Sequence, residues 1–191
     1  DRPDVLSIYR VRMTGDKALY PVLLSNGNCV AQGENADGTH RFEGMLLVKD
    51  TKRQVLYELR DMTGKIASPQ SKKLSAENWY GAVYYAVIPP QGRKKDQYTL
   101  LGWKGHSAVE TRKVIEVLTF NGPVPTFGAP LFDDGRRTRD LRKIFGYGFQ
   151  ASMSLKWDAV NKGIVFDHLS AEDPSFSGQA ALMGPDLSFD A

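Results

Sequence analysis

The feature that most constrains the fold is a stretch of extended-type sequence at positions 98–132. It reads YTLLGWKGHSAVETRKVIEVLTFNGPVPTFGAPLF. Two runs rich in β-branched and aromatic residues, 98–103 and 111–120, are separated by a glycine-containing loop, and Asn121-Gly122 then supplies tight-turn chemistry. No part of the stretch carries a helix-length apolar period. It therefore predicts strands joined by turns.

Similar short runs recur along the rest of the chain between polar turns. Strands are predicted at residues 29–32, 40–49, 54–60, 81–88, 98–103, 111–120, 126–132, 141–157 and 163–169. The 141–157 segment is one long strand or two, because Gly146 and Gly148 suggest a bulge or bend. Residues 5–13 alternate but could also form a short helix. One helical turn is expected at 75–79, capped by Ser75, and the tail at 170–191 is expected to be loop-rich, with short extended pieces near 179–183.

These elements predict an all-β fold, mainly an antiparallel meander, built as a sandwich, a barrel or a propeller-like unit. At most one or two short helical turns accompany it. The 191 residues suffice for one sizeable core, and no linker divides them, so we expect a single β-rich domain over 1–191. The native ends could extend beyond Asp1 and Ala191.

Several classes of site are disfavoured by composition. The single cysteine, Cys29, cannot form an internal disulfide or a cysteine-only metal site, and the three histidines show no ligand spacing. We therefore expect no metal and no cofactor. A net charge of +3 is too small to indicate nucleic-acid binding. No run of about 18 apolar residues is present, so no transmembrane segment is expected.

No catalytic motif stands out, but a set of loop residues defines one alternative site. His106 lies in a glycine-flanked loop, His168 lies on a predicted strand, and Asp133 and Asp134 lie on a charged turn. If these side chains converge, they could form the pocket of a hydrolase or a glycan-binding module. Otherwise they are solvated polar residues.

Two surface features suggest partner binding. Trp79, Tyr80, Tyr84 and Trp103 fall on one predicted aromatic hairpin, with Trp79 and Tyr84 on opposite faces. Either the fold covers both faces or one face binds a partner or a glycan.

The second feature is a basic cluster, GRRTRDLRK at 135–143, which includes Arg136, Arg137, Arg139 and Arg142. It could contact anionic lipid head groups or an acidic partner. The alternative is a set of solvated turns that keep edge strands from pairing.

More than half of the chain resembles a family of uncharacterised exported proteins of Bacteroidota. The matching motifs are WYGA at 79–82, YTLLGW at 98–103, RKVIEVL at 112–118, FGAP at 127–130, ASM at 151–153, IVFDHL at 164–169 and GPDLSFD at 184–190. Residues before Asp50 fit only loosely. The resemblance implies a mainly β fold and a cell-envelope location, periplasmic or associated with the outer membrane, and carries no activity.

Together these observations favour a non-enzymatic envelope protein that acts through protein–protein contacts as a component of an envelope assembly. The alternative is the hydrolase or glycan-binding module described above. The two hypotheses differ in whether His106, Asp133 and His168 share one pocket.

Overall fold

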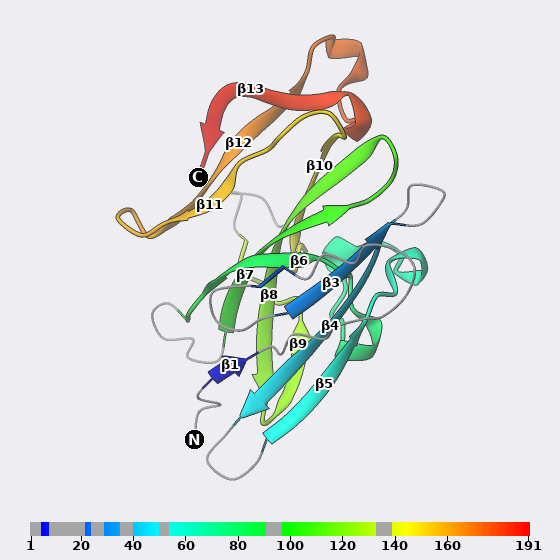
Figure 1. Ribbon diagram of the computed structural model, residues 1–191. Coiled ribbons are helices and arrows are strands. Elements are labelled where there is room, and N and C mark those ends of the chain that lie inside the picture. The colour runs from blue at the N-terminus through cyan, green and yellow to red at the C-terminus, as the bar shows by residue number, and fades with distance from the viewer. Residues whose placement is uncertain are drawn as a thin grey trace.

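The computed structural model describes residues 5–7, 22–23, 29–34, 40–49, 54–90, 97–132 and 139–191 (Figure 1). In these ranges the chain forms antiparallel strands and short 3-10 turns, without an α-helix. The predicted all-β class is therefore confirmed, although the described residues contain five short 3-10 turns where at most two helical turns were expected. The strands fall into three sheets, each open in its described strand order.

The first sheet is organised around one long strand. It contains β1 (Val5–Ser7), β2 (Val22–Leu23), β3 (Cys29–Glu34), β4 (His40–Lys49) and β5 (Gln54–Arg60). β4 pairs antiparallel with β1, β3 and β5. The bounds of β4 and β5 agree with the predicted strands. Of the 5–13 segment, 5–7 is a strand and the remainder lies outside the described residues.

The central sheet has the strand order β10-β8-β7-β6, and β9 also pairs with β8. Its members are β6 (Val83–Ile88), β7 (Gln97–Gly105), β8 (Glu110–Asn121), β9 (Val124–Phe127) and β10 (Lys143–Gly148). Gly122 has a φ of 58°, which confirms the tight turn predicted at Asn121-Gly122. β9 ends at Phe127, earlier than the predicted 126–132 strand, because Gly128 follows with a φ of 97°.

The third sheet is formed by β11 (Leu155–Asp158), β12 (Gly163–Ala171) and β13 (Met183–Asp190) in that order. The extended pieces expected near 179–183 are wrong for residues 180–182, although Met183 begins a strand. Residues Ala180–Leu182 form the 3-10 turn η5, and a second such turn, η4, covers Pro174–Phe176. The real strand is β13, whose Gly184-Pro185 start and polar face give it no clear apolar alternation.

Strand alternation buries both faces of the central sheet. Leu100 and Val114 join the core shared with β4 and β5 of the first sheet. Their neighbours Leu101 and Ile115 point to the opposite side and join a second core with β11 and β12. The central sheet is thus sandwiched between the other two, as the three groups of strands in Figure 1 show.

A loop of three 3-10 turns connects β5 to β6. The turns are η1 (Thr63–Lys65), η2 (Pro69–Ser71) and η3 (Ala76–Asn78). η3 confirms the predicted helical turn, with Ser75 in the N-cap position, although the Ser75 side chain makes no capping hydrogen bond. The loop is held against the central sheet by backbone pairing between Leu74 and Phe127.

Candidate binding sites

The aromatic residues predicted to bind a partner belong to the core. Trp79, Tyr80 and Tyr84 are almost completely buried, and the Trp79 Nε1 group donates to the Tyr84 hydroxyl at 3.0 Å. Their assignment to a contact surface is therefore wrong, and the core-packing interpretation is confirmed. The prediction that Trp79 and Tyr84 lie on opposite faces of one hairpin is also wrong. β6 begins only at Val83, and Gly81 turns the chain before it with a φ of 66°. Trp103 is half-buried and packs against the same core.

Arg142 was expected in an exposed basic cluster, but it is 0% exposed. Its Nε atom lies 2.7 Å from Glu116 Oε2, and its terminal nitrogens donate to the carbonyl oxygens of Pro69, Lys72 and Phe127. A buried guanidinium needs this full set of acceptors because no water replaces them. Arg142 therefore cannot contact a lipid surface.

Contact of the rest of the basic cluster with a lipid surface or an acidic partner stays a prediction. Arg139 is exposed, and Arg136 and Arg137 lie outside the described residues.

The two histidines of the alternative pocket have different surroundings. His106 is half-buried, and burial together with the nearby Arg112 charge lowers its pKa. His168 is exposed on β12, with Nδ1 2.8 Å from Asp186 Oδ2, and this hydrogen bond raises its pKa. Asp133 and Asp134 lie outside the described residues. Within the described part, no group of three His, Cys, Asp or Glu residues could hold a metal ion.

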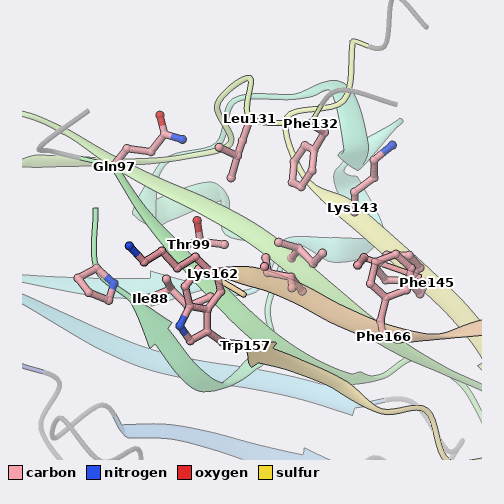
Figure 2. Close-up of a pocket in the computed structure, with 15 residues that line it drawn as sticks. Ile88, Gln97, Thr99, Leu131, Phe132, Lys143, Phe145, Trp157, Lys162 and Phe166 are labelled. Carbon is pink, nitrogen blue, oxygen red and sulfur yellow. The ribbon is translucent and has the colours of Figure 1, made fainter. Parts of the chain in front are cut away.

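One cavity of about 660 Å³ opens between the central and third sheets. We call it the intersheet cavity and define it by Ile115, Phe145, Trp157, Lys162, Ile164 and Phe166. Figure 2 shows Phe145 and Phe166 close together at one end and Lys162 beside Trp157 at the other. The two phenyl centroids are 4.7 Å apart. The arrangement gives an aromatic, largely apolar lining with a cation at its edge.

A second depression, of about 720 Å³, lies where the β7–β8 loop, the end of β10 and the start of β13 meet. We call it the acidic groove and define it by its apolar residues Val109, Phe149, Phe176 and Leu182 and its carboxylates Glu172, Asp173 and Asp186. The four apolar side chains are all exposed. Neither His106 nor His168 lines the groove or the intersheet cavity, although Ala108 and Asp186, which lie close to them, line the groove.

Two glycines of β10 allow the wall of the acidic groove to form. A Cβ atom on Gly146 would lie 2.7 Å from the Ala180 Cβ, and one on Gly148 would lie 2.8 Å from the Ala181 carbonyl oxygen. Larger residues would therefore push η5 away from the sheet. The bulge or bend predicted at Gly146 and Gly148 is absent, because both residues pair with β8 in regular register. Close approach of η5, not strand bending, requires them.

Sequence reasoning missed the acidic groove because its residues come from separate segments. Phe149 donates its backbone N–H to the Val109 carbonyl oxygen at 3.0 Å, which joins the end of β10 to the β7–β8 loop. Leu182 is held in η5 by a hydrogen bond to Gln179. The one available signal was Val109, an apolar residue in the loop between the predicted strands 98–103 and 111–120, where a water-exposed apolar residue is worth noting. Phe149 gave no signal because it lay inside the predicted 141–157 strand.

The matches to known proteins cover only short segments of this chain. No family model matches the chain, and no solved structure matches it. Aminopeptidase N of Haemophilus influenzae is 58% identical over 43 residues, which are 22% of this chain and 5% of that protein. Aminopeptidase N of Escherichia coli is 58% identical over 40 residues, or 21% of this chain and 5% of that protein. The chain thus spans about 5% of the length of these relatives.

Among the described residues, none of the helical segments has the length and apolar character needed to cross a membrane.

Proposed function

We propose that this protein is a non-enzymatic domain of the cell envelope that works by binding another protein, as a component of an envelope assembly. The acidic groove is the contact site. The observation that carries this proposal is the gathering of exposed apolar side chains: of the ten large ones in the described residues, four line this one groove. Exposed apolar surface of this kind marks interaction sites because covering it removes it from water.

The charge of the groove indicates the kind of partner. Three carboxylates line it, and no Lys or Arg is among its described lining residues. Asp186 stays ionised because hydrogen bonds from Ser188 and His168 hold its pKa well below the usual range. A complementary partner segment presents apolar side chains together with basic residues, because carboxylates and cations then meet across the contact.

The envelope location is supported by the resemblance to exported Bacteroidota proteins. Neither the intersheet cavity nor the acidic groove contains His106 or His168, so neither supports the hydrolase or glycan-binding alternative. The short likeness to aminopeptidase N covers too little of either protein to carry a peptidase activity to this chain.

A matched pair of peptides tests the groove directly. Both peptides carry the same Leu and Phe residues, and the charged positions are Lys in one and Glu in the other. We expect the Lys peptide to bind the full chain at least about tenfold more tightly, with binding that weakens as salt is added. Equal affinity for both peptides, or affinity for neither, would contradict the proposal.

Two Phe variants assign the binding to the groove. Phe149, 59% exposed, lines the groove, whereas Phe189, 64% exposed, does not. Phe149→Asp should abolish binding of the Lys peptide, and Phe189→Asp should leave it unchanged. In crosslinked envelopes the wild-type chain should be recovered with a partner at near-stoichiometric yield, and Phe149→Asp should not. Recovery of the wild type as a lone monomer would refute the assembly role.

A further inference from the structure

We propose that the intersheet cavity is a second, separate binding site, for a small amphipathic carboxylate with an apolar chain or ring body, of the fatty-acid class. The apolar body would lie between the central and third sheets, and the carboxylate would meet Lys162 at the edge. This site does not depend on the acidic groove, because the two share no lining residue.

The lining of the cavity suits an apolar body. Ile88 and Ile115 are buried members of the core beneath it, and Trp157, Phe145 and Phe166 are only partly buried. The aromatic side chains therefore keep surface that a ligand can cover. The volume of about 660 Å³ lies within the range of about 300–1,000 Å³ that is typical of small-molecule sites.

The charged side chains around the cavity favour a ligand with a negative charge. No Asp or Glu is among the described residues that line it, and two lysines are. Lys143 already has an acidic partner, since its Nζ lies 2.8 Å from Asp140 Oδ2. Ala191, the last residue of the sequence, also lines the cavity, but within the described part of the chain no ion pair joins Lys162 to its terminal carboxylate or to any other acid. Lys162 is therefore the cation that a ligand carboxylate can reach.

The turn that carries Lys162 is well defined. Asp158 accepts hydrogen bonds from the backbone N–H groups of Val160 and Asn161, and Lys162 follows with a φ of 53°. The nearest carboxylate in sequence is thus engaged with its own turn. Lys162 stands next to Gly163 at the start of β12, so its side chain is placed at the end of the cavity that Trp157 lines.

The test compares two ligands with the same tail. Dodecanoate and dodecyltrimethylammonium are titrated into the full chain below the concentrations at which they form micelles. Heat of binding and tryptophan fluorescence are measured. We expect saturable one-to-one binding of dodecanoate, at least about tenfold weaker binding of the cation, and weaker dodecanoate binding at high salt. Equal binding of the two, or no saturable binding, would overturn the proposal.

Matched variants locate the site. Lys162→Glu should weaken dodecanoate binding by about threefold or more, whereas Lys156→Glu, an equal charge change on an exposed residue outside the cavity lining, should not. Leu131→Asp places a carboxylate on a lining residue that is 43% exposed, and it should weaken binding while the protein stays folded. Equal affinities for Lys162→Glu and Lys156→Glu would refute the role of Lys162.

A groove variant separates this inference from the proposed function. Phe149→Asp should leave dodecanoate affinity unchanged, because Phe149 does not line the intersheet cavity. If Phe149→Asp removed dodecanoate binding, the acid would bind in the acidic groove and the intersheet assignment would be wrong.

Discussion

At the scale of single residues, Lys104 is an unexpected charge inside the fold. It is 1% exposed, and its Nζ donates to the carbonyl oxygens of Tyr80 at 2.9 Å and Gly81 at 2.8 Å. The Phe42 ring lies beneath it, 4.4 Å from Nζ to the centroid. Burial lowers the pKa of Lys104 to about 8, although the Asp61 carboxylate at 3.8 Å opposes this change. Carbonyl dipoles, an aromatic face and one acid therefore compensate the loss of water only in part.

The lowered pKa makes stability depend on pH. Between about pH 8 and the unfolded pKa of 10.5, the unfolded chain binds more protons at Lys104 than the folded chain. The free energy of unfolding should therefore rise with pH above about 8, and urea titrations at about pH 7 and about pH 9 measure this rise. Lys104→Met should show a smaller rise. Burial also lowers the pKa of Lys113, and Lys113 contributes equally to the rise in stability of both proteins. An equal rise in the two proteins would contradict the assignment.

At the scale of elements, Arg142 joins segments that the sequence keeps far apart. It is on the chain just before β10, its partner Glu116 is on β8, and its other acceptors are in the β5–β6 loop and at the end of β9. Burial raises the pKa of Glu116, and Arg142 opposes this effect. The single guanidinium thus fixes the loop and two strands to one point.

Removal of this guanidinium should be costly. Arg142→Met leaves the buried Glu116 carboxylate without its cation, with only the Val117 N–H as a donor, and leaves the Lys72 carbonyl oxygen without one. We therefore expect a loss of about 3–5 kcal/mol in the free energy of unfolding by urea titration. Arg142→Met with Glu116→Leu should recover only part of this loss, because the Lys72 carbonyl oxygen remains without a donor and the Phe127 carbonyl oxygen keeps only the Leu74 N–H. The exposed Arg139→Met should change stability by no more than about 0.5 kcal/mol. Similar losses at Arg139 and Arg142 would refute this role.

The same elements show what could be predicted from the sequence. The strands β4, β5 and β8 were predictable because alternation of apolar and β-branched residues is a local signal. β13 was not, because Gly184, Pro185 and a polar face hide its extended conformation. Arg142 was assigned to the surface because arginine is rarely buried, and its burial depends on Glu116, 26 residues away in sequence. The acidic groove escaped prediction for the same reason, since contacts between distant segments create it.

At the scale of the whole molecule, the central sheet links the two cores. Leu100 packs toward the first sheet and Leu101 toward the third. Neither outer sheet can bury its apolar face without the central strands, since each core takes side chains from both of its sheets. If residues 1–191 form one domain, as the sequence predicts, the three sheets should unfold together in one cooperative transition.

Two neighbouring Leu variants test this prediction. Leu101→Ala removes apolar volume from the core of the third sheet, and Leu100→Ala removes it from the core of the first, each at a cost of about 2–5 kcal/mol. Amide hydrogen exchange of Leu46 in β4 and Phe166 in β12 reports on the two outer sheets. In one cooperative unit, either variant lowers the protection of both amides by the same factor. If Leu101→Ala lowered protection only at Phe166, the third sheet would unfold on its own, and the chain would contain two units instead of one.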